Sequence, residues 1–493
     1  MKKYRITILF AVLLSGVLFC RCDVKDFGDI NLDPNSPSLA NTSFLFLGAS
    51  RQGIPPFYLT GTYDPWGMIY CQYLSERTNI QFTNFSGLDY VIGGFYTGSL
   101  KYLTKIIELN SDPETMSETY VTGLCNSNIN QIAVARTLKA YIFMHLTDVV
   151  GMIPYSEALQ AKEGNYKPKY DDQQSIYTDL NKELEEAYTQ FVESAPLNSQ
   201  YDIFYNGDIA KWKRFNASVR MQLAIKLFKA DPGSGQTRFA KAYGDGFIRS
   251  NADIFLYPYL NESNNQNPFY DNVVVSARRD FQPSGTLIDT LLKYQDPRIS
   301  AYAVTNAYGD YFGMPFGLDR NGAAQYALED VSQYNPKHYA QNAPGVLITP
   351  SITLLAAAEA AERGWISASA QSLYEEAITA ALSQHGFTGS DVTDYLAQPD
   401  VAYKTGGTQA ERLAQIAMQK WLASYMQDSM EAFADWRRFG VPVLEPGEFA
   451  LVDAIPRRRM YGSTDYNANP ENYNAAIAAQ GPDLMTTRVW WDK

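Results

Sequence analysis

The sequence predicts a mainly helical protein. From Gln131 to Leu146 almost every position is apolar, which is typical of a helix buried on most of its circumference. Further along the chain, apolar residues recur at three- and four-residue steps. With 493 residues, 46% apolar and 19% charged, the chain has the composition of a globular protein. Its length predicts either several domains or one large, repetitive helical body.

The helices that follow the buried one are amphipathic. Gly151 and Pro154 end the buried helix and begin a loop. Asp171 or Asp172 then caps the next helix. The apolar stripe of that helix is Ile176, Leu180, Leu184, Ala187 and Phe191. Another helix is expected from Lys211 to Lys229, with the stripe Trp212, Phe215, Val219, Leu223 and Leu227.

The second half of the chain alternates loops with helices. Residues 255–280 are rich in Asn and Pro and have no helical period, so long loops are expected there. A helix beginning at Thr349-Pro350 and a second one from about Ser367 to Gln384 form a hairpin. Its spacing of small residues and Tyr374 resembles a degenerate tetratricopeptide repeat. A final long helix is expected from Gln409 to Phe439.

The N-terminus has the form of an export signal. Basic residues precede an apolar run, Ile6 to Phe19, which is short for a membrane span. We therefore expect residues 1–21 to be a signal peptide and residues 22–45 to be a lipidated tether. A lipid on Cys22 would hold the chain at a membrane. Cys20 is the alternative acceptor, and a plain signal peptide with soluble release is the competing interpretation.

The charge argues against a nucleic-acid-binding protein, and the cysteine content argues against a fold stabilised by disulfides. The formal charge of -12 disfavours a nucleic-acid partner, because phosphate binding needs clustered Lys and Arg. Loss of residues 1–21 would remove four basic residues and make the chain more acidic still. Only Cys71 and Cys125 lie in the body, so a disulfide framework is not expected; buried free thiols are the preferred interpretation.

No catalytic or metal motif is recognisable. The three histidines are far apart, and no nucleophile elbow or phosphate-binding loop is present. Two carboxylates brought together by folding could still form a glycosidase. The obvious acid pairs, 185–186 and 375–376, lie on expected amphipathic helices, where solvated faces are the more common explanation. We therefore expect a protein without enzymatic activity, cofactor or metal.

Two loop regions have the side chains that bind sugars. Flat rings pack against the faces of sugars, while amides and Arg pair with hydroxyl groups. Such residues gather in 79–96 and 264–281, and Tyr308 and Phe312 extend the second group. The candidate ligand contacts are Asn84, Phe85, Tyr90, Phe269, Arg279, Phe281 and Tyr311. Loop packing, or contact with a partner protein, is the alternative role for each ring.

Several phrases, in order along the chain, resemble the SusD/RagB family of Bacteroidetes outer-membrane lipoproteins, in its SusD-like branch. They are Asp26-Phe27-Gly28-Asp29-Ile30-Asn31, Thr147-Asp148 through Ile153-Pro154-Tyr155, Pro168-Lys169-Tyr170-Asp171, Gly207-Asp208 with Lys211-Trp212, Asp296-Pro297-Arg298, Asp435-Trp436-Arg437-Arg438, Ile455-Pro456-Arg457-Arg458 and Val489-Trp490-Trp491-Asp492-Lys493. We interpret them as scaffold rather than ligand contacts, with Asp435, Arg437 and Arg438 fixing helix ends through charge-assisted pairs.

The resemblance implies an all-α fold. Tetratricopeptide-like helix pairs would form a scaffold, with long irregular loops on the ligand side, in a single domain at 46–493. It also implies a SusC-like TonB-dependent transporter as partner, an oligosaccharide ligand, and a lipid-anchored place on the outer membrane facing the exterior. An oligopeptide ligand is the first alternative, because some members resemble peptide importers. A surface glycoside hydrolase is the second.

Overall fold

The computed structural model describes residues 40–59, 65–86 and 89–493. Residues Asn41–Lys493 form one compact unit. The predicted signal peptide, both candidate lipid acceptors and most of the predicted tether lie outside the described residues. Within the described part of the chain, no helix has the length and apolar character needed to cross a bilayer.

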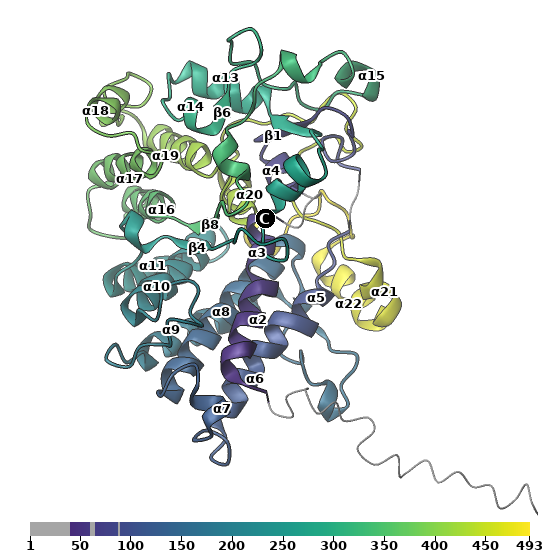
Figure 1. Ribbon diagram of the computed structural model, residues 1–493, viewed down its shortest axis with the longest axis vertical. Helices are drawn as coiled ribbons and strands as arrows, with labels where there is room; N and C mark the ends of the chain where they lie inside the picture. Colours follow the sequence, from purple (N-terminus) through teal and green to yellow (C-terminus); the bar gives the residue numbers. More distant parts are fainter. Residues whose placement is uncertain (1–39, 60–64, 87–88) are drawn as a thin grey trace, which may run out of the picture. The chain divides into compact units, whose positions relative to one another are not determined.

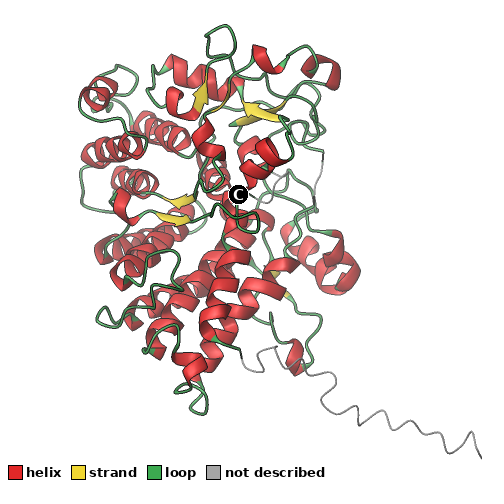
Figure 2. Cartoon of the chain, in the orientation of Figure 1, coloured by secondary structure: helices red, strands yellow, loops and turns green. Residues whose placement is uncertain are grey.

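Helices make up most of the described chain (Figure 2). The longer ones are α2 Thr42–Gly53, α6 Lys101–Ser111, α8 Asn128–Val150, α9 Gln173–Gln190, α10 Ile209–Lys226, α11 Pro232–Asp245, α13 Gly285–Lys293, α16 Pro350–Glu362, α17 Ala370–Gln384, α19 Gln409–Ala423, α20 Ser429–Phe439 and α22 Pro470–Gln480. The shorter ones are α3 Pro55–Tyr58, α4 Trp66–Tyr70, α5 Gly93–Phe95, α7 Thr119–Thr122, α12 Pro268–Tyr270, α14 Ile299–Tyr302, α15 Arg320–Ala323, α18 Ser390–Leu396 and α21 Ser463–Ala468.

The strands are short and form antiparallel pairs. Strand β1 Leu74–Glu76 pairs with β5 Phe281–Pro283, and β2 Ile153–Pro154 pairs with β3 Tyr170–Asp171. Strand β4 Phe255–Tyr257 pairs with β8 Gly345–Ile348, and β6 Ala303–Val304 pairs with β7 Gln333–Tyr334. These ladders connect segments far apart in sequence, so they fix the loops rather than build a sheet.

The helices pack as successive neighbours. Helix α8 packs on α9, α10 packs on α11, and α16 packs on α17. Adjacent pairs also touch, through α9 with α10 and α10 with α16. In Figure 1 this stack runs along the left side, with α13 and α14 at the top and α15 at the upper right. This is the all-α, tetratricopeptide-like scaffold that the sequence predicts.

Several predicted boundaries need correction. The predicted single helix 409–439 is wrong: α19 ends at Ala423 and α20 begins at Ser429. The break is built by Met426, whose φ is 54°, and by Asp428, whose carboxylate accepts the Met430 and Glu431 amide hydrogens at 3.1 and 2.9 Å.

Two smaller corrections concern capping and loops. Asp172 caps α9 by accepting the Ser175 amide at 2.9 Å. Asp171 instead accepts the amides of Tyr155 and Ser156. The predicted loop 255–280 begins with strand β4 and includes helix α12, because Asn267 accepts the Phe269 amide at 2.8 Å and starts a helical turn there. Both elements are too short for a periodicity signal.

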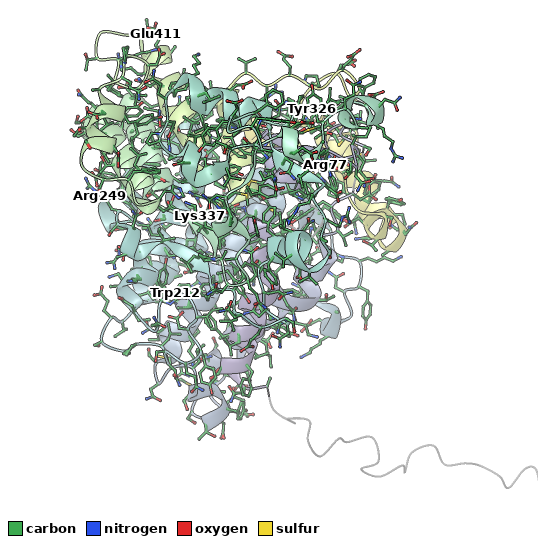
Figure 3. The ribbon with its side chains drawn as sticks, turned by 45° about the horizontal axis from the view of Figure 1, so that its top comes forward. Arg77, Trp212, Arg249, Tyr326, Lys337 and Glu411 are labelled. Carbon is green, nitrogen blue, oxygen red and sulfur yellow. The ribbon has the colours of Figure 1, made fainter. Side chains whose placement is uncertain are left out.

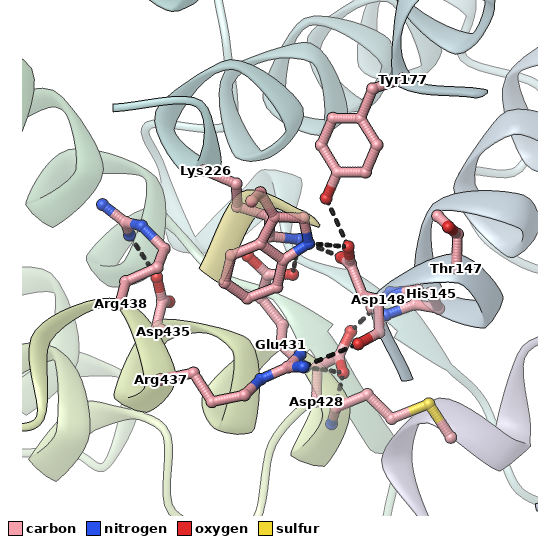
Figure 4. A network of polar contacts seen from close by, with 12 residues as sticks. His145, Thr147, Asp148, Tyr177, Lys226, Asp428, Glu431, Asp435, Arg437 and Arg438 are labelled. Carbon is pink, nitrogen blue, oxygen red and sulfur yellow. Dashed lines mark hydrogen bonds and ion pairs between the residues drawn. The ribbon is translucent and has the colours of Figure 1, made fainter. Parts of the chain in front are cut away.

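The core contains a buried group of charged side chains (Figure 4). Asp148 receives hydrogen bonds from Tyr177, from Lys226 at 2.7 Å and from the Trp491 indole at 2.8 Å. Lys226 also lies 2.6 Å from Glu431. Burial is tolerated here because each charge has an opposite partner or a strong hydrogen bond.

One of the phrases that carry the resemblance, residues 435–438, has a structural role in this chain. Asp435 pairs with Arg438 at 2.7 Å and with Lys420 at 2.7 Å. Arg437 donates to the backbone oxygen of Asp148 at 2.8 Å. These contacts tie α20 to α8 and α19, so the interpretation of the phrases as scaffold is confirmed for these residues.

Candidate functional site

The loops that hold the predicted ligand contacts meet at one place. Strand β1 pairs with β5 in the register Glu76↔Phe281. The ladder continues outward, because the amide of Arg77 donates to the oxygen of Asp280 at 2.7 Å. The hydroxyl of Ser75 donates to the oxygen of Pro315 at 2.7 Å. The segments 76–86, 278–283 and 311–318 are thereby fixed against one another.

A buried carboxylate shapes the first of these loops. Oε2 of Glu76 accepts the amide hydrogens of Phe82 and Thr83 at 2.8 and 2.9 Å. Burial raises the pKa of Glu76 to about 7, against the opposing effect of these hydrogen bonds. The chain after β1 therefore folds back over the carboxylate, and this turns Phe82 and Phe85 inward.

Most of the predicted ligand rings lie in the core. Phe85, Tyr90, Phe269 and Phe281 are 1–4% exposed, and Asn84 is 8% exposed. Each ring packs against other rings: Phe85 on Tyr70 and Phe316, Tyr90 on Trp66, Phe269 on Tyr58 and Tyr334, and Phe281 on Phe82. The faces of these rings are withdrawn from solvent in this structure, so they do not offer a stacking surface.

The structure separates the predicted contacts into groups. Asn84, Phe85 and Phe281 share the neighbourhood of the β1–β5 ladder. Tyr90 lies away from this ladder and forms an isolated β-bridge with Tyr461. Phe269 lies beside β7, where its ring contacts Tyr334. Of the seven candidates, only Arg279 and Tyr311 remain partly exposed.

An exposed aromatic pair lies next to the ladder. The rings of Phe312 and Tyr326 are stacked, with centroids 6.1 Å apart and planes inclined by 23°. Phe312 is 44% exposed and Tyr326 is half-buried. Tyr308, which is 70% exposed, lies on the same loop. We call Phe312 and Tyr326 the ring pair.

Backbone pairing holds the ring pair in place. The amide of Ser332 donates to the Phe312 oxygen at 2.7 Å, and the Phe312 amide donates to the Ser332 hydroxyl at 3.0 Å. Ser332 immediately precedes β7, so these bonds fix Phe312 beside that strand. Tyr326 follows the short helix α15, and its amide donates to the Ala323 oxygen at 3.2 Å. Two segments distant in sequence thus present their rings together.

The ring pair is continuous with the loop after β1. Ile80 and Tyr326 both pack on a small apolar cluster formed by Met314, Ala323 and Val331. Figure 3 labels Arg77, on the segment after β1, and Tyr326. The exposed rings of this surface suit the apolar face of a sugar.

Tyr326 is the residue that sequence reasoning missed. It stands outside both aromatic-rich loops and has no aromatic neighbour in sequence. Its position beside Phe312 depends on the pairing of residues 312 and 332, which no local pattern encodes.

The two acid pairs considered as catalytic candidates each contribute a glutamate to an ion pair at the surface. Glu185 lies 2.6 Å from Lys241, and Glu376 lies 2.6 Å from Arg249. Across the described residues, no group of three or more His, Cys, Asp or Glu side chains is arranged to hold a metal ion.

Comparison with known proteins agrees with the fold. A SusD-like family model, described as starch-binding and associating with the outer membrane, matches residues 42–462. No curated protein matches the chain in sequence. Among solved structures, a chitin-binding protein is 26% identical, with a TM-score of 0.76 over 92% of this chain and 100% of that one.

Two further solved structures are similar. A chitin-binding SusD homologue from Flavobacterium johnsoniae is 24% identical, with a TM-score of 0.75, over 92% of this chain and 98% of that one. A SusD homologue from Bacteroides uniformis is 24% identical, with a TM-score of 0.75, over 93% of this chain and 100% of that one. Because the family model spans most of the chain and the helical scaffold is shared, this protein belongs to the SusD-like family of outer-membrane-associated binding proteins.

Proposed function

We propose that this protein is a cell-surface lipoprotein that captures oligosaccharides and delivers them to a SusC-like TonB-dependent transporter in the outer membrane. The observation that carries the ligand class is the exposed, stacked ring pair of Phe312 and Tyr326 in a SusD-like chain. Two similar structures are described as chitin-binding, so β-linked N-acetylglucosamine oligomers are the first ligands to test.

The proposed contacts are the ring pair, Tyr308, and the two earlier candidates that stay partly exposed, Arg279 and Tyr311. The rings would stack on the apolar faces of successive sugars. Arg279 would donate hydrogen bonds to hydroxyl or acetamide oxygens, because a guanidinium has several donors in a fixed geometry. Burial raises the pKa of Tyr311, so its hydroxyl stays protonated near neutral pH and can also donate.

Isothermal titration of the full chain against chitin-, starch- and xylan-derived oligosaccharides tests the proposal. We expect one glycan class to bind without being cleaved. Replacing Phe312→Ala or Tyr326→Ala should weaken binding by about three- to tenfold, the size of one lost aromatic contact. Phe44→Ala is the matched control, because Phe44 is 59% exposed and its ring also packs edge-on against a tyrosine, Tyr201.

The other outcomes each overturn a part of the proposal. Binding of oligopeptides but not of glycans would change the ligand class to peptide. Release of shorter sugars would mean that the protein is a glycoside hydrolase. Glycan binding that survives both ring-pair substitutions would move the site away from this surface.

Lipidation is a separate part of the proposal. We assign the lipid to Cys22, with Cys20 as the competing position. Metabolic labelling with radioactive palmitate should be lost in Cys22→Ala and retained in Cys20→Ala. The reverse result would assign Cys20, and labelling of neither form would mean soluble release. Co-purification with a transporter from native membranes tests the SusC-like partner.

A further inference from the structure

A cavity of about 240 Å³ lies between helices α8 and α9. One wall is the side of α8 that carries Arg136, Lys139 and Phe143, which follow one another at three- and four-residue steps and so share a face. The facing wall carries Asp179 and Glu183 of α9, four residues apart. The cavity shares no lining residue with the ring pair. In Figure 1 helices α8 and α9 lie at the lower left, whereas α15, next to the ring pair, lies at the upper right.

The loop after β2 closes the third side of the cavity. Tyr155, the first residue of that loop, donates its hydroxyl hydrogen to Oδ2 of Asp179 at 2.7 Å. Its ring packs edge-on against Phe143, with the centroids 4.8 Å apart. The Asp171 carboxylate accepts the amides of Tyr155 and Ser156 at 3.2 and 2.8 Å, which holds the loop in this position. The cavity therefore has a fixed aromatic surface beside its charged groups.

All but one of the charged side chains that line the cavity have partners. Nε and Nη2 of Arg136 each donate to a Glu183 oxygen at 2.9 Å, and Tyr155 donates to Asp179. Lys139 differs, because no described residue accepts a hydrogen bond from its ammonium or forms an ion pair with it. Burial lowers the pKa of Lys139, against the opposing effects of Glu183 and Asp179. The ammonium is thus partly desolvated without the partner that would compensate it.

The unpaired ammonium has access to the cavity. Lys139 is half-buried and lines the cavity, and its Nζ keeps surface that solvent can reach, unlike the fully buried unpaired atoms elsewhere in the described chain. The same is true of Oδ1 of Asp179, which accepts no hydrogen bond from a described residue, while Oδ2 accepts from Tyr155. One free donor and one free acceptor therefore border the same small space.

This combination indicates the chemistry of a ligand. A hydroxyl group both donates and accepts, so neighbouring sugar hydroxyls can accept from Lys139 and donate to Asp179. The lining residues contribute two cations and two carboxylates, which favours a neutral ligand over an anion or a cation. The volume lies below the usual range for ligand pockets, about 300–1,000 Å³, so a single small unit fits rather than a chain. The ring of Tyr155 and the side chain of Leu159 provide apolar surface for C–H groups.

We propose that this cavity binds one neutral monosaccharide. Lys139 donates to one hydroxyl, Asp179 accepts from the neighbouring hydroxyl, and Tyr155 packs against the C–H groups of the sugar ring. The site goes beyond the proposed capture of oligosaccharides, because it takes a single sugar and uses no residue of the ring pair.

Saturation-transfer NMR of the full chain with single sugars tests the proposal. The probes are glucose, galactose, mannose and N-acetylglucosamine, each compared with its O-methylated derivative, which keeps the ring but lacks the hydroxyl hydrogens. Alanine, glucuronate and putrescine represent a zwitterion, an anion and a cation. We expect at least one neutral sugar to bind, and its O-methylated derivative to bind at least about tenfold more weakly. Binding of the charged probes alone, equal binding of each sugar and its derivative, or no binding by any sugar would overturn the proposal.

Variants connect sugar binding to the cavity. Lys139→Met should weaken binding about tenfold, the effect of losing one charge-assisted hydrogen bond. Asp179→Asn should weaken it about threefold or more, because the amide oxygen can still accept from Tyr155 but is a weaker, neutral acceptor for the sugar. Lys101→Met is the matched control, because Lys101 is an exposed lysine on α6. Unchanged binding in both cavity variants, or binding that is lost in Phe312→Ala instead, would place the sugar elsewhere and overturn the assignment.

Urea denaturation separates a binding role of Lys139 from a structural one. Since its ammonium has no partner among the described residues, Lys139→Met should leave the midpoint of unfolding unchanged or raise it, while sugar binding falls. A lysine that stabilised the fold through an ion pair would show the opposite result. A lower midpoint in Lys139→Met would therefore contradict the free ammonium on which the proposal rests.

Discussion

Lys226 and Asp148 form an ion pair inside the protein, with Nζ 2.7 Å from Oδ2 and both side chains withdrawn from solvent. Burial alone would lower the pKa of Lys226, but Asp148 and Glu431 outweigh that effect and raise it. The ammonium therefore stays charged, and it compensates two carboxylates that would otherwise be buried without a counter-charge.

We expect Lys226→Met to destabilise the protein by roughly 3–5 kcal/mol, because it leaves Asp148 and Glu431 without their cation. Urea denaturation followed by circular dichroism measures this change. Lys213→Met is the control: Lys213 pairs with Glu193 at 2.7 Å, but on the surface, and its loss should cost less than about 1 kcal/mol. Equal losses of unfolding free energy in the two variants would contradict the claim that burial makes the Lys226 ion pairs more important for stability.

The buried carboxylate of Glu76 should make stability depend on pH. Because burial raises its folded pKa to about 7 from an ordinary 4.5, the folded state binds the proton more tightly. Stability from this group is therefore present below about pH 4.5 and is lost as pH rises toward 7. The loss amounts to at most about 3 kcal/mol.

Glu76→Gln isolates that contribution. Its unfolding free energy should change less between pH 5 and 8 than that of the native chain, while its oxygen still accepts the amides of Phe82 and Thr83. Denaturation at a series of pH values measures the difference between the two proteins. Parallel pH profiles would mean that Glu76 titrates normally.

Gly317 should be intolerant of a side chain. Its φ is +69°, and a Cβ there would lie 2.2 Å from the Gly447 Cα. Gly317→Ala should cost roughly 2–5 kcal/mol and raise hydrogen exchange in residues 445–452. Gly309→Ala is the matched control, because Gly309 has a φ of +91° but open space around its Cβ position, so only the backbone cost of about 1–2 kcal/mol remains.

Cys71 and Cys125 should resist alkylation in the folded protein. Both are buried free thiols, and burial raises the pKa of each thiol, which suppresses the reactive thiolate. Iodoacetamide at pH 8 followed by peptide mass spectrometry should label both residues only after unfolding. Labelling of Cys71 in the native protein would contradict its buried position.

The sequence was most informative where periodicity is long. The apolar run at 131–146 predicts a buried helix, and the structure has α8 there, extended to Val150. The stripes of α9 and α10 and the hairpin of α16 and α17 follow from the same signal. The break at Met426 was missed, because apolar periodicity continues across it while a single left-handed residue and the Asp428 cap interrupt the backbone.

The site was harder to predict than the scaffold. The aromatic-rich loops predicted Phe85, Tyr90, Phe269 and Phe281 as ligand contacts, but composition cannot distinguish a ring that packs inward from one that stays exposed. In the first loop the chain folds over the Glu76 carboxylate, and this fold turns the rings inward. Tyr326 joins Phe312 only through backbone pairing with a distant segment, which is a tertiary property.

The partners of Asp148 have a consequence for biogenesis. Its hydrogen bonds come from Tyr177, Lys226 and Trp491, so the third of them cannot form until Trp491 has been synthesised. A shorter nascent chain could already pair Asp148 with Lys226, but it would lack the indole donor that completes this buried site. The packing around Asp148 is therefore complete only when the last residues of the chain are present.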